Sequence, residues 1–135
     1  MKKPSYLPIF GILAVTALLH LSALKFYLYF DLWWLDIMLH FLGGVWVAAT
    51  VFWVYYFSGW YKNPVASASR FFIVSLAGAI IGGIAWELFE YHAGLTFVLP
   101  GIDYKVDTLC DLGMDAVGGL SAYLYYRLTR RSLFH

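Results

Sequence analysis

Residues 32–57 have the sequence LWWLDIMLHFLGGVWVAATVFWVYYF, in which Asp36 is the only Asp, Glu, Lys or Arg. A helix that crosses the hydrocarbon core of a bilayer needs about 20 consecutive, mainly apolar residues. Lipid offers the peptide backbone no hydrogen-bond partners, so a spanning segment must be helical unless strands close into a barrel. This stretch therefore predicts a transmembrane helix and a membrane protein.

Three further apolar runs lie on either side of this stretch, at about residues 7–24, 71–94 and 107–126. The prolines lie near the ends of the runs or between them, where they leave continuous helix undisturbed. Four segments are too few to close a barrel. We therefore predict an all-α, polytopic membrane helix bundle with about four transmembrane helices, which forms a single domain over residues 1–135.

The composition supports lipid as the main partner. Of the 135 residues, 62% are hydrophobic and 13% are charged, whereas a soluble domain has about 45–50% and about 25%. A net charge of +1 without a long basic stretch argues against nucleic-acid binding. One cysteine, Cys110, cannot form an internal disulfide.

The basic residues predict the orientation of the bundle. Seven of the nine fall at the two ends of the chain or in the loop after residue 57, and Lys25 and Lys105 fall on the other side. The positive-inside rule then places both termini and the loop after residue 57 in the cytoplasm. We interpret the first segment as a retained signal anchor, the alternative being a cleaved secretory signal. The seven bases are Lys2, Lys3, Lys62, Arg70, Arg127, Arg130 and Arg131.

The acidic residues are sorted to the opposite side. All eight fall on the extracytoplasmic side or in the outer half of a predicted span, although topology depends little on Asp and Glu. Insertion therefore does not explain their placement, which suggests a function. They are Asp31, Asp36, Glu87, Glu90, Asp103, Asp107, Asp111 and Asp115.

The spacing of these acids places them on helix faces. Asp36 and His40 are four residues apart, Glu87 and Glu90 are three apart, and Asp111 follows Asp107 by four and precedes Asp115 by four. Residues at such spacings share one face of a helix. Because a helix rises about 1.5 Å per residue, three predicted helices carry carboxylates at a similar depth.

A carboxylate near the bilayer centre costs about 2.5–3.5 kcal/mol on insertion scales, and less toward the interface. Lys25 and Lys105 are too few to neutralise the set, so protons, water or a cation must do so. Carboxylates with one imidazole suit a divalent ion such as Mg²⁺, Mn²⁺, Ca²⁺ or Zn²⁺. We predict Glu90 as a candidate general base and five metal ligands: Asp36, His40, Glu87, Asp111 and Asp115.

Other polar residues have simpler interpretations. Asp107 is expected to cap the fourth helix, Asp31 and Asp103 to be solvated, and His20 to have a packing role. His92 is expected to lie off the Glu87–Glu90 face, and His135 in the tail. The glycine pairs and steps predict close helix packing or the interface of a homo-oligomer; they are Gly43, Gly44, Gly78, Gly82, Gly83, Gly118 and Gly119.

Three motifs carry a resemblance to a known group of proteins. They are LDIMLHF at 35–41, WELFEY at 86–91, and DTLCDLGMD at 107–115 followed by Gly118-Gly119. In this order they resemble the YjdF-like and VanZ-like small bacterial inner-membrane proteins, the YjdF-like form being closer. Ile37 stands where the family pattern usually has Lys, which leaves the region more acidic. The resemblance implies a four- or five-helix inner-membrane protein and no settled reaction; the VanZ branch is associated with glycopeptide resistance.

Three hypotheses of function follow from these observations. The first is a metal-binding protein or metal-dependent enzyme, open to the extracytoplasmic side, that acts on a lipid-linked or envelope substrate. The second is a proton- or cation-coupled transporter that works as an oligomer. The third is a non-catalytic membrane partner subunit. The sequence does not decide whether the protein is an enzyme.

Overall fold

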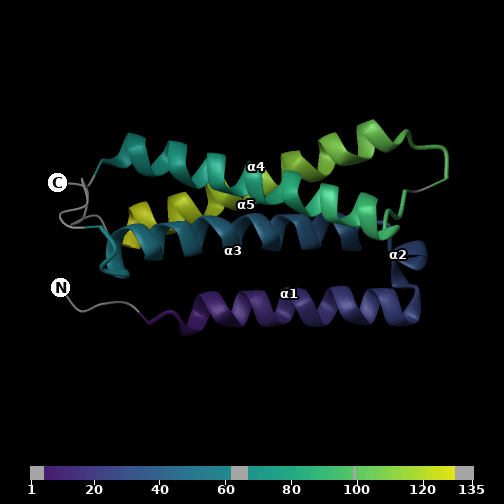
Figure 1. Cartoon of the computed structure of the whole chain (residues 1–135), viewed down its shortest axis with the longest axis horizontal. Coiled ribbons are helices and arrows are strands. Elements are labelled where there is room, and N and C mark those ends of the chain that lie inside the picture. Colours follow the sequence, from purple (N-terminus) through teal and green to yellow (C-terminus); the bar gives the residue numbers. More distant parts are fainter. Residues whose placement is uncertain (1–4, 62–66, 99, 130–135) are drawn as a thin grey trace.

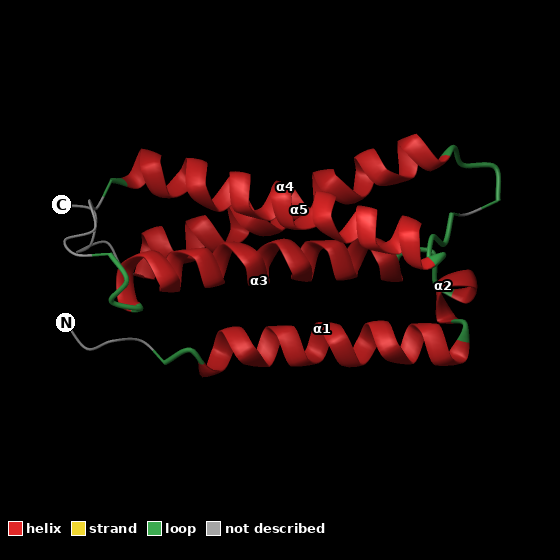
Figure 2. Cartoon of the chain, viewed as in Figure 1, coloured by secondary structure: helices red, strands yellow, loops and turns green. Residues whose placement is uncertain are grey.

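The computed structural model describes residues 5–61, 67–98 and 100–129, and within these ranges all regular structure is helical (Figures 1 and 2). The all-α prediction is confirmed for this part of the chain. The helices are α1 (Leu7–Phe26), α2 (Leu28–Asp31), α3 (Leu35–Phe57), α4 (Ala68–Ala93) and α5 (Tyr104–Thr129).

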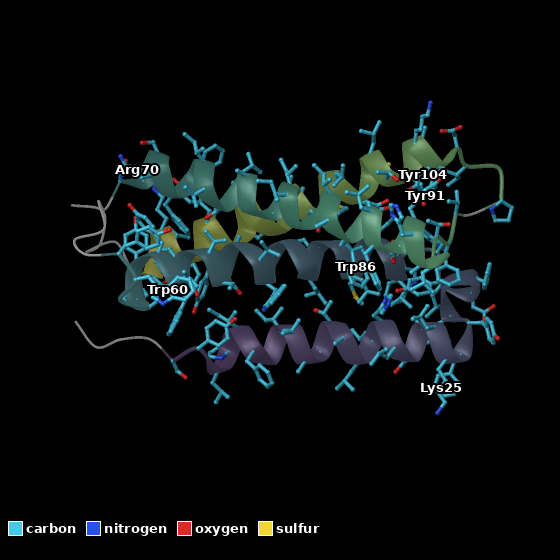
Figure 3. The ribbon with its side chains drawn as sticks, viewed as in Figure 1. Lys25, Trp60, Arg70, Trp86, Tyr91 and Tyr104 are labelled. Atoms are coloured by element: carbon cyan, nitrogen blue, oxygen red, sulfur yellow. The ribbon has the colours of Figure 1, made fainter. Side chains whose placement is uncertain are left out.

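The four long helices run up and down, so that the start of α1, the end of α3, the start of α4 and the end of α5 lie at one end of the bundle (Figure 1). Helices α3, α4 and α5 pack against one another, and α1 packs against α3. The short α2 covers the opposite end. Figure 3 shows Trp60 and Arg70 at the first end, and Lys25, Tyr91 and Tyr104 at the end near α2.

The helix boundaries differ from the predicted spans mainly around Tyr27. This residue ends α1 in a left-handed conformation, with φ of 59°, which is uncommon for a residue with a side chain. The chain then forms α2, and α3 begins at Leu35 instead of residue 32. Helix α4 ends at Gly94, whose φ of 68° is typical of a glycine that follows a helix.

The predicted capping role of Asp107 is wrong, because α5 begins three residues earlier than expected. Asp107 lies in the first turn of the helix. Asp103, which we expected to be only a solvated loop residue, accepts a hydrogen bond from the backbone N–H of Lys105 at 2.9 Å. It thereby satisfies one of the free donors at the start of α5. Asp31 is exposed, as expected.

Three of the described helices are long and apolar enough to cross a membrane: α1, α3 and α4. The fourth predicted span corresponds to α5, whose apolar character is lower because its first half carries three aspartates. Of the bases that predicted the orientation, Lys2, Lys3, Lys62, Arg130 and Arg131 lie outside the described residues.

The bundle is apolar outside and carries buried acids inside. Leu18, Ile81 and Leu109 are each more than 60% exposed, whereas Asp111 and Asp115 are 4% exposed. This arrangement is the reverse of a soluble protein, in which acidic side chains are almost never fully buried without a partner. An outer surface of this kind fits a lipid environment.

Glycines allow α3, α4 and α5 to approach closely. A Cβ atom on Gly118 would collide with the backbone of α3 at Phe41, and one on Gly119 would come within 2.7 Å of Ala79 on α4. The Gly78–Gly82 step lies against Val47 and Val51 of α3. These glycine faces are therefore covered by helices of the same chain.

Candidate metal centre

His40 lies at the centre of the acidic region, one turn and a half into α3, and its side chain is 3% exposed. Its Nδ1 lies 3.1 Å from Oδ2 of Asp115 on α5. A carboxylate can only accept, so Nδ1 carries the hydrogen of this bond. In the neutral ring, this tautomer leaves a lone pair on Nε2.

The other ring nitrogen faces two carboxylates. Nε2 lies 3.5 Å from Oε1 of Glu87 on α4 and 4.0 Å from Oδ1 of Asp36, one turn before it on α3. It is buried and makes no hydrogen bond. A lone pair that faces carboxylate oxygens is repelled by them, so a positive species between these atoms would stabilise the arrangement.

The remaining two acids, Asp111 and Glu90, each belong to a group of three side chains that could hold a metal ion together with His40. One ligand atom each from Asp36, His40 and Asp111 lies within 4.8 Å of the others, and the same holds for His40, Glu87 and Glu90. Two ligands on opposite sides of an ion, each about 2.2–2.5 Å from it, are about 4.4–5 Å apart. Both groups could therefore hold a divalent ion with little movement.

Asp115 is placed by glycines on two neighbouring helices. A Cβ atom on Gly44 of α3 would collide with the backbone carbonyl of Asp115, and one on Gly83 of α4 would collide with its side-chain Oδ2. A Cβ atom on Gly43 would lie 3.6 Å from Oδ1 of the same carboxylate. These glycines give Asp115 the space to reach Nδ1 of His40.

The sequence did not indicate a role for Thr108. Its hydroxyl donates to Oε2 of Glu87 at 2.8 Å, which leaves Oε1 of that carboxylate toward His40. A second hydrogen-bonded shell of this kind commonly orients metal ligands. Thr108 and Asp111 are three residues apart, which places both on one face of α5. This spacing could have indicated that Thr108 faces the acidic region.

The charges of the region do not balance within the protein. Five acids surround one imidazole, and in the described ranges no lysine or arginine side chain lies within 4.0 Å of a carboxylate oxygen; the contacts of this kind are all made by His40. Lys25 and Lys105 are exposed. Buried carboxylates without partners are costly, so the structure favours cations or protons in this region.

The other histidines do not join the ring of acids. His92 is exposed, and its Nδ1 donates to the carbonyl of Leu88 at 2.7 Å. Nδ1 of His20 lies 2.6 Å from the hydroxyl of Tyr29 on α2. Burial, together with the charges of Asp36 and Glu90, raises the pKa of Tyr29, so this hydroxyl keeps its proton. His135 lies outside the described residues.

Of the six residues predicted for the site, five are less than 10% exposed: His40, Glu87, Glu90, Asp111 and Asp115. Asp36 is partly buried. The structure brings all six to one end of the α3–α4–α5 bundle, with Asp115 on the opposite edge of the imidazole from Asp36 and Glu87.

Comparison with known proteins gives a family and no further relative. The chain has no match among curated proteins or among solved structures. A family model described as a predicted membrane protein, DUF2238, matches residues 5–132, which include every residue of the acidic region. The chain therefore belongs to the DUF2238 family of predicted membrane proteins.

Proposed function

We propose that the protein binds one divalent metal ion at Nε2 of His40 and acts as a metal-dependent membrane enzyme on a lipid-linked or envelope substrate. The observation that carries the metal proposal is the buried, unbonded Nε2, which faces carboxylates from separate helices. Nitrogen with several oxygens is a ligand set used for Mn²⁺ and Zn²⁺, and carboxylates suit Mg²⁺ and Ca²⁺.

We propose two roles for the predicted ligands, which the contacts of His40 support. Oxygens of Asp36 and Glu87 lie within 4.0 Å of Nε2, and Asp111 forms one group with Asp36 and His40. We propose these three acids as ligands together with His40. Asp115 bonds to Nδ1. We therefore propose it as the residue that orients His40 and no longer as a ligand, an arrangement that metal-binding histidines commonly use.

Glu90 keeps its proposed role as general base. It belongs to the group around His40 and Glu87, so its carboxylate lies close to the proposed ion. A bound divalent ion activates water or polarises a phosphoryl oxygen. A carboxylate beside that water would accept its proton.

The membrane arrangement that we propose has four spans, with α5 as the fourth. Leu109, Val117 and Leu124 of α5 are exposed, and its aspartates at 111 and 115 are buried. The face of α5 that would meet lipid is therefore apolar, although the helix as a whole is less apolar than α1, α3 and α4. We also propose an inner-membrane location with the acidic end extracytoplasmic, a cytoplasmic position for both termini, and residues 1–135 as one domain.

An aromatic cluster at the other end of the bundle bears on the transporter hypothesis. Phe52, Phe71 and Tyr123 form a buried cluster at the end of the bundle opposite to His40, and Tyr126 stacks on Phe52 with 3.9 Å between ring centroids. The described residues at this end of the bundle include no carboxylate, so a cation that left the acidic region through a single chain would meet no acidic ligand there. The transporter hypothesis has no comparable support.

The family match bears on two further predictions. We propose that the chain is close to the YjdF-like proteins, as the three motifs indicate. The VanZ-like resemblance has no support from the match, and its association with glycopeptide resistance is not carried over. A homo-oligomer through the glycine faces also has little support, because α3, α4 and α5 already cover these faces.

Metal analysis of protein purified in mild detergent without chelator tests the proposal. We expect about one divalent ion per chain, its loss in His40→Gln, and its retention in His92→Gln, where the histidine is exposed and outside the site. The metal proposal would be overturned if wild-type protein held no stoichiometric ion and none of Mg²⁺, Mn²⁺, Ca²⁺ and Zn²⁺ raised its melting temperature.

A further inference from the structure

A cavity of about 310 Å³ lies between α1 on one side and α3 and α4 on the other. This volume is at the lower end of the range of small-molecule sites, about 300–1,000 Å³. Side chains of the proposed metal centre form part of its wall, namely Asp36, His40 and Asp115. The cavity therefore connects directly with the acidic region.

The lining changes from polar to apolar along the helix axes. Near α2 it contains Asp36, His40, His20 and Tyr29, and toward the middle of the bundle it contains Leu13 and Val47. The lining residues of α3 extend from Asp36 to Val47, which is about 16 Å at 1.5 Å per residue. One leaflet of the hydrocarbon core is about 15 Å thick.

The cavity is open to the outside of the bundle between α1 and α4. Among the described residues, α1 has no backbone approach to α4. Ala17 and Leu21 of α1 and Trp86 of α4 line the cavity and are also exposed. Figure 3 shows Trp86 reaching toward α1, where its ring meets that of His20 edge to face at 5.0 Å.

We propose that this cavity binds one hydrocarbon chain of a membrane lipid, with the phosphate of the lipid head group at the His40 centre. The chain would enter between α1 and α4, beside Trp86, and lie along Leu13 and Val47. The polar end of the cavity would then receive the head group in the leaflet next to α2. This orientation is the one that a lipid of that leaflet already has in the bilayer.

The head-group part of this proposal rests on the proposed function. The carboxylates around His40 repel an anionic phosphate unless a cation lies between them. A divalent ion on Nε2 would supply that cation and bind a phosphate oxygen directly. His20 shares a hydrogen bond with the Tyr29 hydroxyl through Nδ1, and its ring adds a polar group to this end of the cavity.

Photo-crosslinking in vesicles tests the proposal. Two probes are used separately: phosphatidylglycerol with a diazirine near the carboxyl end of one acyl chain, to reach Leu39, and the same lipid with the diazirine midway along that chain, to reach Val47. Each probe is added to phosphatidylcholine vesicles that contain the full chain and Mn²⁺. Mass spectrometry then maps the labelled residues. We expect label at Leu39 and Val47, which line the cavity and are buried or half-buried, in addition to label at Ile81, which is 66% exposed.

Two matched variants show whether the label reports the cavity. Ala17→Trp fills it from α1 and should lower the label at Leu39 and Val47 at least fivefold. Leu18→Trp adds the same ring to the neighbouring residue, which is 65% exposed and does not line the cavity, and should change nothing. Leu21→Trp, at an exposed lining position, serves in place of Ala17→Trp if that variant does not fold.

The outcomes separate the cavity from the metal centre. Replacing Mn²⁺ by a chelator should lower the label at Leu39 and Val47 at least threefold. Equal labelling of these residues with Mn²⁺ and with the chelator would overturn the head-group contact. Label confined to exposed residues such as Ile81, in protein that still binds Mn²⁺, would overturn the cavity proposal alone. Label at Leu39 in protein that binds no Mn²⁺ even when the chelator is left out would keep the chain site and overturn the proposed function.

Discussion

Replacing Gly83 by alanine tests whether Asp115 orients His40, without altering either residue. The new Cβ would collide with Oδ2 of Asp115 and would lie 2.8 Å from Cγ of that side chain. Leu112 Cδ2, at 3.0 Å, limits the space on the same side. The carboxylate must therefore move away from α4.

The size of this movement follows from the distances. Ordinary contacts of a Cβ atom begin at 3.4 Å, so Cγ of Asp115 must shift by at least about 0.6 Å. The Nδ1–Oδ2 hydrogen bond measures 3.1 Å, and a similar lengthening takes it beyond about 3.6 Å, where it is no longer a hydrogen bond. Loss of a hydrogen-bond partner that orients a metal ligand typically lowers metal affinity about 10- to 100-fold, or about 1.4–2.8 kcal/mol.

The assay is a Mn²⁺ or Zn²⁺ titration of purified protein in mild detergent, followed by calorimetry. We expect Gly83→Ala to bind 10- to 100-fold more weakly than the wild type. Gly113→Ala is the matched control, because a Cβ atom on this glycine of α5 has no neighbour within 4 Å. Wild-type affinity in Gly83→Ala, with its melting temperature within a few degrees of the control, would refute the orienting role of Asp115.

Three further predictions concern single side chains. Asp115→Asn keeps the size of the side chain but removes its charge, and should lower metal affinity about 10- to 100-fold, whereas Asp31→Asn, at an exposed position, should leave the same titration unchanged. Thr108→Val removes the hydrogen bond to Glu87 and should lower affinity up to about tenfold; Thr108→Ser keeps the hydroxyl and should bind like the wild type, and equal binding by all three proteins would contradict the role of Thr108. Phe52→Ala leaves a cavity in the aromatic cluster, where Phe52 is 0% exposed, and should cost about 3 kcal/mol of stability. Thermal unfolding measures that loss, while the metal content should stay at the wild-type level because the cluster lies at the opposite end of the bundle.

Much of the helical framework could be predicted from local patterns. Long apolar runs specify α1, α3 and α4 because lipid leaves the backbone no alternative to helix. The end of α1 could not be predicted, because Tyr27 adopts a left-handed conformation that single residues with a side chain rarely take. Asp107 was predicted as the cap of α5 instead of Asp103 for a related reason. Both are acids near the start of the helix, and only the backbone conformation decides which one precedes the first turn.

The candidate site was predictable as a set of residues and not as a set of roles. Helical spacing places Asp36 with His40 and Glu87 with Glu90, but it does not say which edge of the imidazole each acid approaches. That choice depends on the crossing of α3, α4 and α5 at Gly44 and Gly83, which lets Asp115 reach Nδ1. The cavity beside α1 depends in the same way on helix positions that no local pattern encodes.

X-ray absorption spectroscopy of the metal-loaded protein tests the central claim most directly. The account predicts one ion per chain whose spectrum shows a single imidazole nitrogen and oxygen ligands at about 2.0–2.2 Å for Zn²⁺. The imidazole signal should disappear in His40→Gln and persist in His92→Gln. A bound ion without imidazole, or the same spectrum in wild type and His40→Gln, would contradict a metal centre built on His40.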